Sequence, residues 1–362
     1  MKSWEKHVKL FIPGPVEVYP EILKEVGRPV IGHRDRPFQD LFADTVSKLK
    51  KVMFTENDVF LSTSSATGVW EGCARNCIEK KALACVNGAF SKHWHQVALA
   101  NGKAADKIDL AWGKAIKPGM IDEKLASGEY DSLLFVHNET STGVANPLYE
   151  VAKVMQKYPD VMFIVDAVSS LTGMKVEVDK LGIDVCLASV QKAFAVPPGL
   201  AVFSVSQKAY ERAARMKSRG FYFDFLVFRE FAEKNQTPCT PAIPQIYGLN
   251  KQLDRMLAEG MENRFLRHKL MAEYTRKWAV SRGFGLFAEK GYESDTLTAV
   301  TNKKGINVDD LNRKLGERGV AISNGYGDLK EKTFRIAHMG DTKPDEIKEL
   351  LGTIDDILGG EK

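Results

Sequence analysis

The sequence predicts an α/β fold with a mostly parallel sheet, followed by a smaller α+β domain. Three observations support this prediction. Short apolar runs alternate with amphipathic stretches through the larger, N-terminal part of the chain. A helical stretch rich in Leu, Met, Lys and Glu then covers residues 243–280, and shorter strand and helix patterns follow it. Finally, the length of 362 residues suggests two domains, because single cores rarely grow beyond about 250–300 residues.

The larger part contains six short apolar runs that are typical of buried strands. They lie at 59–62, 81–86, 132–137, 161–166, 185–189 and 200–204, with helical patterns at 68–80, 92–101 and 148–158 between several of them. Parallel strands need crossover connections of this kind. Such sheets bind ligands at the carboxyl ends of their strands, so polar residues directly after the apolar runs are the first candidates for a site.

The two ends of the chain have different patterns. Pro13, Gly14 and Pro15 exclude a continuous helix, so we expect an extended arm there. The pattern over 243–280 predicts one long helix that leaves the large domain. Beyond it, we expect strands at 296–301, 320–323 and 333–338, and helices at 308–318 and 344–358. The chain is thereby divided into an arm (1–20), a large domain (21–255) and a small domain (256–362).

Composition excludes several classes of protein. Lys and Arg total 51 against 47 Asp and Glu, a formal charge of +4 that lacks the strongly basic balance of nucleic-acid binding. No apolar run reaches the roughly 18 residues that span a bilayer, and the N-terminus lacks the apolar core of a secretory signal. The 5 scattered cysteines have no metal-site spacing and suit free thiols in a reducing compartment. We therefore expect a cytoplasmic protein with no metal, no membrane partner and no nucleic-acid partner.

Two predicted strand ends carry the residues with the most distinctive chemistry. Asp166 ends one apolar run and Lys192 follows another, so both should lie at the ligand-binding edge of the sheet. A lysine beside a buried site has a lowered pKa, which suits Schiff-base chemistry. A nearby acid can hold the ring nitrogen of pyridoxal phosphate protonated. The two residues suit this cofactor, although an ordinary structural salt bridge would use the same pair.

Two further segments follow predicted strands. The segment 63–68 reads Thr-Ser-Ser-Ala-Thr-Gly before a helix, where backbone N–H groups can seat a phosphate or the hydroxyls can serve only as an N-cap. Phe90 follows Asn-Gly-Ala at 87–89 and could stack on a flat ring or pack in the core. Neither segment alone decides between these alternatives.

Six short motifs stand in a fixed order along the chain. They are Phe-Ile-Pro-Gly-Pro at 11–15, Gly-His-Arg at 32–34, His-Asn-Glu-Thr-Ser-Thr-Gly-Val at 137–144, Val-Asp-Ala-Val-Ser-Ser at 165–170, Gln-Lys at 191–192 and Phe-Arg-Ile-Ala-His-Met-Gly at 334–340. Together they resemble the class V (fold type I) pyridoxal-phosphate aminotransferases, in particular alanine–glyoxylate and serine–pyruvate aminotransferases. The similarity covers nearly the whole chain and implies a mostly parallel seven-stranded sheet.

The resemblance also implies roles for individual residues. Lys192 would be the Schiff-base lysine and Asp166 would pair with the ring nitrogen. Arg335 would bind the substrate α-carboxylate as a two-pronged fork. The other implied cofactor contacts are Phe90 and Val168 on the ring, Thr140 at the ring hydroxyl, and Ser65, Ala66, Thr67 and Gln191 at the phosphate.

A segment that reads Thr-Pro-Cys-Thr-Pro at 237–241 implies an assembly. By the resemblance, Thr240 would reach the phosphate bound to the neighbouring subunit, so the active unit would be a homodimer. Thr237 belongs to the same cofactor-binding segment, but it stands where some relatives carry a tyrosine. The phosphate loop also departs from the Ser-Gly-x-Gly/Thr of many relatives. These departures leave the choice of substrate open.

The leading functional hypothesis is an aminotransferase that moves the amino group of alanine or serine to glyoxylate or pyruvate. Arg34 and Arg36 allow an alternative, because a second anion site there would favour a phosphoserine or aminophosphonate aminotransferase. The same two arginines could instead form a solvated basic loop, which is the more common role of such a segment. A non-catalytic protein on this fold is a third alternative, and the presence of Lys192, Asp166 and Arg335 argues against it.

Overall fold

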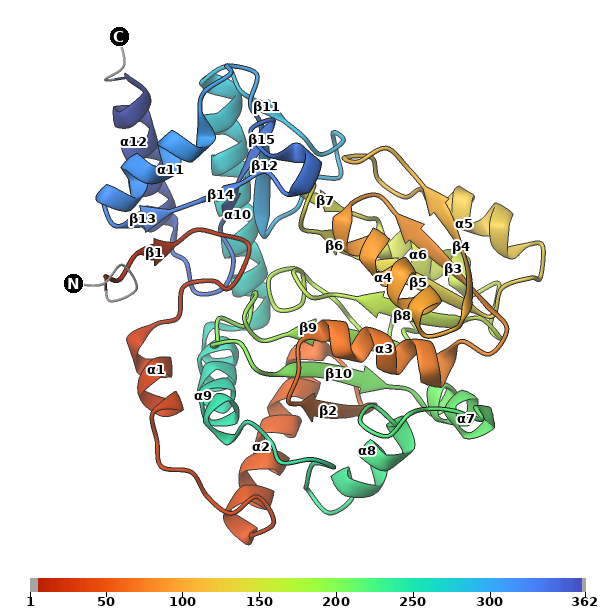
Figure 1. The fold of residues 1–362 in the computed structure, drawn as a ribbon. Coiled ribbons are helices and arrows are strands. Elements are labelled where there is room, and N and C mark those ends of the chain that lie inside the picture. The colour runs from red at the N-terminus through yellow and green to blue at the C-terminus, as the bar shows by residue number, and fades with distance from the viewer. Residues whose placement is uncertain (1–5, 360–362) are drawn as a thin grey trace.

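The computed structural model describes residues 6–359, so the first five residues of the predicted arm and the last three of the predicted small domain lie outside the described part. A seven-stranded sheet forms the centre of the larger part (Figure 1). Its order is β2 (Asp58–Ser62), β10 (Ala201–Val205), β9 (Val185–Ser189), β8 (Met162–Asp166), β5 (Ser132–Val136), β3 (Lys81–Val86) and β4 (Ala104–Asp109). Only β10 pairs antiparallel with its neighbours, which confirms the predicted mostly parallel sheet.

Strands that are buried on both faces of the sheet can be recognised in the sequence by their apolar runs. The strands β5, β8, β9 and β10 are buried along their whole length, as parallel sheets covered on both faces require. The edge strand β4 is different, because only Ile108 in it is buried. Its sequence therefore lacks an apolar run, so this strand was not among those expected from the sequence.

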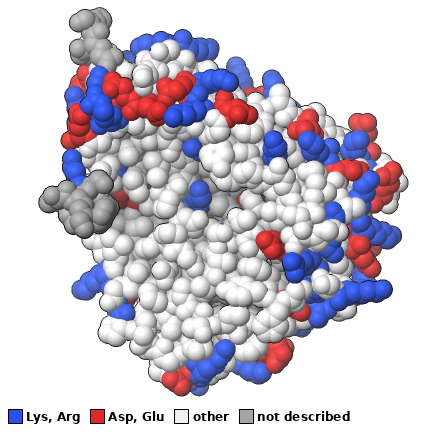
Figure 2. Space-filling view, in the orientation of Figure 1, with Lys and Arg blue, Asp and Glu red and all other residues white. Residues whose placement is uncertain are grey.

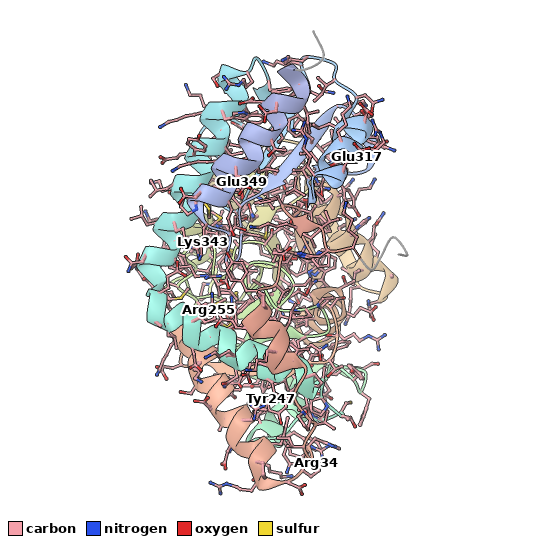
Figure 3. All side chains as sticks on the ribbon, turned by 90° about the vertical axis from the view of Figure 1, so that its left-hand side faces the viewer. Arg34, Tyr247, Arg255, Glu317, Lys343 and Glu349 are labelled. Atoms are coloured by element: carbon pink, nitrogen blue, oxygen red, sulfur yellow. The ribbon has the colours of Figure 1, made fainter. Side chains whose placement is uncertain are left out.

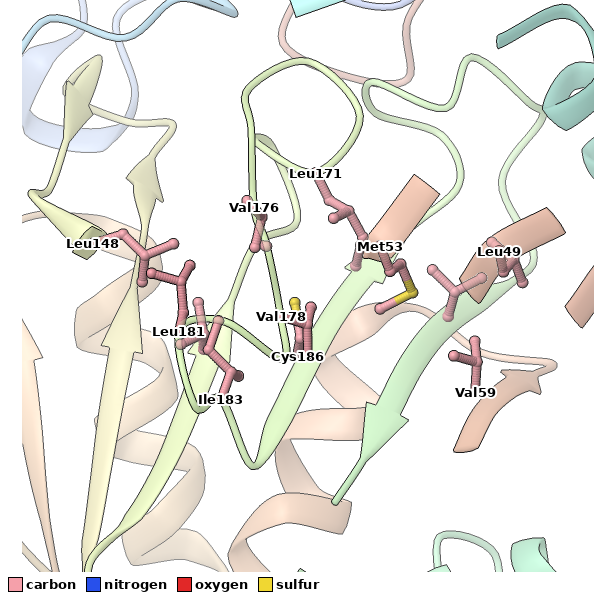
Figure 4. Packing of buried hydrophobic residues seen from close by; sticks show 14 of the residues in the cluster. Leu49, Met53, Val59, Leu148, Leu171, Val176, Val178, Leu181, Ile183 and Cys186 are labelled. Atoms are coloured by element: carbon pink, nitrogen blue, oxygen red, sulfur yellow. The ribbon is translucent and has the colours of Figure 1, made fainter. Parts of the chain in front are cut away.

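Helices cover both faces of this sheet, and successive strand residues point to opposite faces. Phe163 and Val165 of β8 belong to one buried cluster, and Ile164 belongs to the other. The first cluster includes residues of α2 (Arg36–Met53), α5 (Pro118–Leu125), α6 (Leu148–Met155) and α9 (Ile243–Glu259). Figure 4 shows Leu49 and Met53, which α2 contributes to this cluster. The second packs against α3 (Ala66–Cys77), α4 (Ala89–Ala100), α7 (Gln207–Arg215) and α8 (Phe225–Ala232).

The predicted single helix over 243–280 is wrong. The structure has two helices, α9 and α10 (Met261–Ser281), separated by Gly260. Gly260 has a φ of 80°, a left-handed value that a helix cannot accommodate and that glycine adopts without steric cost. The chain therefore changes direction there, and α10 packs with the C-terminal elements. The predicted domain boundary at 255/256 falls inside α9 and stays a prediction.

The C-terminal part has its own sheet and core. Its four strands lie in the order β11 (Gly285–Leu286), β12 (Leu297–Thr301), β15 (Thr333–Ala337) and β14 (Ser323–Asn324). Beside them lie α10, α11 (Val308–Glu317), α12 (Pro344–Gly359) and the short 3-10 turn Gly327–Leu329. Buried residues such as Trp278, Phe334 and Ile347 form this core. The strands expected at 296–301 and 333–338 and both expected helices are confirmed, with small shifts at their ends. The single strand expected at 320–323 is wrong, because residues 320–321 pair with the N-terminal arm and residues 323–324 pair with β15.

The N-terminal segment joins the C-terminal part before it enters the large sheet. β1 (Lys9–Leu10) pairs with β13 (Val320–Ala321), and Phe11 is buried in the C-terminal core. α1 (Pro20–Val26) follows the extended arm. A short hairpin of β6 (Asn138–Glu139) and β7 (Val144–Ala145) follows β5. Within residues 6–359, no helix is both long and apolar enough to cross a bilayer.

Candidate functional site

Asp166 and Lys192 lie at neighbouring strand ends, as the sequence predicts. Asp166 is the last residue of β8, and Lys192 follows the end of the adjacent β9 by three residues. The start of α3 reaches the same edge, because the backbone N–H of Ala66 donates to Oγ of Ser189 at 2.8 Å. The structure thus brings the acid, the lysine and the first turn of a helix to one edge of the sheet.

The Asp166 carboxylate is buried and held by one donor on each oxygen. The indole Nε1 of Trp70 donates to Oδ2 at 2.9 Å, and the backbone N–H of Val168 donates to Oδ1 at 2.8 Å. Burial raises the pKa of Asp166 to about 7, although both hydrogen bonds act in the opposite direction. Trp70 itself stacks on Trp94 at 5.8 Å. Sequence reasoning missed Trp70, even though it lies one helical turn after Ala66.

Lys192 lies against the N-terminal arm. Its Nζ donates to the backbone carbonyl of Pro13 at 2.8 Å. Burial lowers its pKa to about 8, the charge of Arg335 lowers it further, and the charge of Asp166 opposes both effects. Gly14 has a φ of 134°, which favours glycine, and it lets the arm approach the Lys192 side chain closely. The pKa of Lys192 is therefore close to neutral pH, and the backbone of the arm partly covers its side chain.

Glu139 fixes the first turn of α4 from within the hairpin. This buried carboxylate accepts from the backbone N–H and the hydroxyl of Ser91 at 2.9 and 2.8 Å, and from the hydroxyl of Ser141 at 2.6 Å. A negative charge is favourable at a helix N-terminus. The backbone N–H of Phe90 also donates to it at 3.3 Å, so Glu139 helps to hold Phe90 in place. In the sequence, Glu139 stands within the motif at 137–144, but nothing in that motif indicates this role.

Thr140 links the hairpin to both the Asp166 loop and the C-terminal sheet. Its Oγ1 lies 2.8 Å from Oγ of Ser169, three residues beyond Asp166. Its backbone carbonyl accepts from Nη1 of Arg335 at 3.4 Å. Nearby, Nδ1 of His137 lies 2.9 Å from Oγ of Ser170, and burial lowers the pKa of His137 to about 4. The histidine is therefore neutral at physiological pH.

Arg335 keeps part of its hydrogen-bonding capacity. Nε and Nη2 donate to the carbonyl of Asn324 at 3.3 and 3.2 Å, and Nη1 donates to Thr140. A guanidinium has five N–H donors, so two remain after these three bonds. Burial lowers the pKa of Arg335 to about 10, which leaves it charged at neutral pH. Among residues 6–359, no carboxylate forms an ion pair with it.

The segment predicted to seat a phosphate lies at the start of α3. Ser65 is the N-cap residue, but its side chain makes no capping hydrogen bond. Ser65 and Thr67 are exposed, Ala66 is buried, and Gln191 is half-buried beside them in sequence with Lys192. A side-chain N-cap, the alternative left open by the sequence, is therefore not formed. In this first turn the backbone N–H of Ala66 donates to Oγ of Ser189 and that of Gly68 to the carbonyl of Ser65, so an anion there would chiefly meet the exposed Thr67.

Arg34 and Arg36 are not brought to Arg335 within one chain. Arg34 donates to the carbonyl of Thr237 at 2.8 Å and lies over the ring of Phe231, while Arg36 is exposed and pairs with Asp40 at 2.7 Å. Figure 3 shows Arg34 at one end of the molecule and Glu317 and Glu349, which mark the C-terminal helices, at the other.

The Thr-Pro-Cys-Thr-Pro segment lies on the surface beside the start of the phosphate loop. Thr237 is buried and donates to the carbonyl of Cys239 at 2.7 Å, and Thr240 is exposed. The backbone N–H of Ala242 donates to Oγ1 of Thr63 at 3.0 Å. The structure thus brings together most of the predicted cofactor residues in one chain, with Thr237 and Thr240 at their margin.

The arrangement fits pyridoxal phosphate. A buried acid with a raised pKa and a lysine with a lowered pKa lie at adjacent strand ends. The acid can face a ring nitrogen, the lysine can bind an aldehyde covalently, and the uncapped start of α3 can receive a phosphate. An arginine with two remaining donors stands on the side of the C-terminal sheet.

Comparison with known proteins places these features in a family. The family model described as aminotransferase class-V matches residues 23–330. The chain is 40% identical over 354 residues to an uncharacterized aminotransferase of Methanocaldococcus jannaschii, covering 96% of this chain and 91% of that protein. It is 32% identical over 360 residues to a serine–glyoxylate aminotransferase of Methylorubrum extorquens, covering 95% and 89% of the two chains.

A solved structure of a similar protein has the same fold. The crystal structure of an alanine–glyoxylate aminotransferase from Nostoc sp. superposes with a TM-score of 0.92 at 27% identity. The superposition covers 97% of this chain and 95% of that one. The similarity therefore extends over both sheets and the segments between them.

Proposed function

Because the chain belongs to the class V aminotransferases and is a pyridoxal-phosphate-dependent transaminase, we propose that it moves the amino group of alanine or serine to glyoxylate or pyruvate. One observation carries this choice of substrate. Arg335 has two remaining donors for a carboxylate, and its flank is covered by the ring of Tyr326, which packs in turn against Phe90. A substrate with one carboxylate and a small uncharged side chain suits this surrounding. The names of the serine–glyoxylate and alanine–glyoxylate relatives support glyoxylate as the acceptor.

Each residue of the site has a definite task in this proposal. When bound, pyridoxal phosphate supplies an aldehyde that Lys192 can hold covalently and a ring that withdraws electrons from the substrate Cα. Asp166 holds a proton on the ring nitrogen, and Trp70 and Val168 keep its carboxylate in one orientation. Arg335 binds the substrate carboxylate with a charge-assisted fork. Lys192, with a pKa of about 8, would move the proton between the substrate Cα and the C4′ carbon of the cofactor, first as general base and then as general acid.

The cofactor would be held at several points along the sheet edge. Phe90 and Val168 would contact the two faces of the ring, and Thr140 the ring hydroxyl. The phosphate would be bound by Ser65, Ala66, Thr67 and Gln191. The ring and phosphate contacts follow β2, β3, β8 and β9, which run in the same direction in the sheet of Figure 1, and Thr140 lies in the β6–β7 hairpin after β5.

We also propose that the active unit is a cytoplasmic homodimer in which Thr240, with Thr237 beside it, completes the phosphate site of the neighbouring subunit. Thr240 is exposed, and Phe221 in the preceding loop is 74% exposed. Figure 2 shows a broad area with few charged side chains on the face that carries α9 and β2, which suits an interface. Sedimentation should show a dimer, and a fully active monomer would contradict this assembly.

The alternative of a phosphoserine or aminophosphonate substrate would need a second anion site beside Arg335. Within one chain, Arg34 is bonded to Thr237 and Arg36 to Asp40. The alternative could therefore draw on these arginines only from a neighbouring subunit.

The proposed function is tested by half-reactions of the holoenzyme. Alanine, serine, aspartate and phosphoserine are added separately, and the cofactor absorbance is followed as the amino group is transferred. Alanine and serine should react at least about tenfold faster than aspartate or phosphoserine, because each of the latter brings a second anion that must be desolvated. Faster reaction with phosphoserine would replace the proposal with its alternative, and no reaction with any amino acid would refute it.

A further inference from the structure

Asn324, the last residue of β14, stabilises the loop that connects β14 to β15. Oδ1 of Asn324 accepts from the backbone N–H groups of Gly325 and Glu331 at 2.7 and 2.9 Å, which closes the loop at both ends. Gly325 packs so closely that an added Cβ would lie 1.9 Å from the carbonyl oxygen of Leu329. The conformation of the loop therefore requires glycine at 325, and Asn324 stabilises it by accepting both N–H groups. Tyr326, the next residue, is held at a defined place.

Tyr326 lies between the two residues that flank the substrate side of the site. Its ring centroid is 5.3 Å from that of Phe90, which comes from the first turn of α4. The guanidinium carbon of Arg335 lies over the same ring at 5.5 Å from its centroid. Tyr326 is half-buried, and within residues 6–359 its hydroxyl makes no hydrogen bond. It therefore presents mainly the surface of an aromatic ring.

The position of the ring is compatible with carboxylate binding by Arg335. An aromatic ring stacks on the face of a guanidinium, whereas a carboxylate binds along its N–H edge. Tyr326 can thus cover the face while the two remaining donors of Arg335 bind a substrate. The aromatic pair formed by Phe90 and Tyr326 therefore stands beside the arginine that would hold the substrate carboxylate.

We propose that Tyr326 determines the side-chain specificity of the enzyme by closing the substrate pocket beside Arg335. This inference rests on the proposed function. The ring limits the length and branching of the side chain, because a well-packed wall leaves no room for added carbon atoms. It also disfavours a second carboxylate, because a ring face offers no donor to a desolvated anion. The pocket therefore selects substrates with one carboxylate and a small, uncharged side chain.

The test compares two unreactive carboxylates, propionate and 3,3-dimethylbutyrate, whose dissociation constants for the holoenzyme are measured by calorimetry. Both have one carboxylate for Arg335, and they differ only in bulk. The unaltered enzyme should bind propionate at least about tenfold more tightly, as expected for a pocket that rejects extra methyl groups. In Tyr326→Ala this preference should fall to about twofold or less, whereas Tyr326→Phe should retain it.

The control is Tyr274→Ala, because Tyr274 is 46% exposed on α10 and outside the site. Circular dichroism and cofactor absorbance verify that each variant is folded and loaded. In parallel, the rate of the half-reaction with alanine is compared with the rates for 2-aminobutyrate and norvaline. In Tyr326→Ala, the half-reaction rates with 2-aminobutyrate and norvaline should increase relative to the rate with alanine by at least about tenfold.

The two proposals fail in different ways. If the unaltered enzyme reacts with no amino acid, the proposed function fails. If it reacts with alanine but Tyr326→Ala keeps the original preference among both carboxylates and donors, the role of Tyr326 is refuted while the function stands. A preference lost equally in Tyr274→Ala would also refute it, because the effect would then be general.

Discussion

The indole N–H of Trp70 and the carboxylate of Asp166 form a 2.9 Å hydrogen bond that ties α3 to the end of β8. The backbone N–H of Val168 binds the other oxygen at 2.8 Å. Both donors favour the charged form of the acid, whereas burial raises its pKa to about 7. The ionisation of Asp166 at neutral pH is therefore set by a balance between burial and two hydrogen bonds.

The first prediction removes one of these bonds. Trp70→Phe keeps an aromatic ring against Trp94 but loses the indole donor. A hydrogen bond to a charged group contributes about 1.5–3 kcal/mol, so transamination should fall at least about tenfold while the cofactor stays bound. The acid limb of the pH–rate profile should move to higher pH, because the pKa of Asp166 rises further when a donor is lost.

The matched control is Trp278→Phe, which removes an indole hydrogen bond to Asp355 in the C-terminal part. This variant should keep the rate and the pH profile of the unaltered enzyme. An unchanged profile in Trp70→Phe would show that the indole does not govern Asp166.

The second prediction concerns Asp166→Asn. An amide cannot balance a protonated ring nitrogen, so the rate should fall by about two to three orders of magnitude with cofactor retained. Near-normal turnover would mean that Asp166 has only a structural role.

The same variant has an independent readout in the cofactor-free protein. Burial raises the pKa of Asp166 from its usual value near 3.9 to about 7, so the folded state keeps a proton that the unfolded state releases. The free energy of unfolding therefore decreases as the pH rises from about 4 to about 7. In Asp166→Asn the side chain at this position does not titrate, so this decrease in the free energy of unfolding disappears. Its free energy of unfolding in urea should match that of the unaltered protein near pH 4 and exceed it by about 2–4 kcal/mol at pH 8.

The sequence predicts the buried part of the fold better than its edges and junctions. Strands such as β8 and β9 are covered on both faces, so their residues form apolar runs that are visible in the sequence. The edge strand β4 is mostly solvent-accessible and has no such run. Gly260 is one residue in a long helical pattern, where glycine costs only about 1 kcal/mol, so the pattern alone could not locate the break between α9 and α10.

Within the site, residues at strand ends could be predicted and their partners could not. Asp166 and Lys192 follow apolar runs, which places them at the sheet edge. The Pro13 carbonyl bonded to Lys192 is a backbone group of a distant segment and has no side-chain pattern. Trp70 could have been considered from its spacing to Ala66 along α3, but its direction towards Asp166 depends on how the helix packs on the sheet. The roles proposed for the cofactor residues stay predictions.

The third prediction is that Lys192→Ala abolishes transamination and leaves the fold intact. No other side chain in the site can hold the cofactor covalently and also exchange a proton with the substrate Cα. Circular dichroism should be unchanged and turnover of alanine with glyoxylate should be undetectable. Lys175→Ala, which removes a surface lysine paired with Glu262, is the control and should remain active. More than trace turnover in Lys192→Ala would refute the assignment.

The last prediction separates the two anion-binding candidates. Arg335 has two remaining donors near Lys192, whereas Arg34 is bonded to Thr237 and Arg36 to Asp40. Arg335→Ala should weaken the binding of alanine and serine by about 2–4 kcal/mol, because their carboxylate would be desolvated without its partner. Both half-reactions should be affected alike, since donor and acceptor share the carboxylate, and cofactor absorbance should be unchanged. The double variant Arg34→Ala with Arg36→Ala should lose less activity with alanine and serine than Arg335→Ala does, and any loss should come from the Thr237 segment that Arg34 supports. A selective loss of phosphoserine activity in that double variant would instead show that these arginines bind a second anion across the subunit interface. Unchanged affinity of Arg335→Ala for every amino acid would show that another group binds the carboxylate.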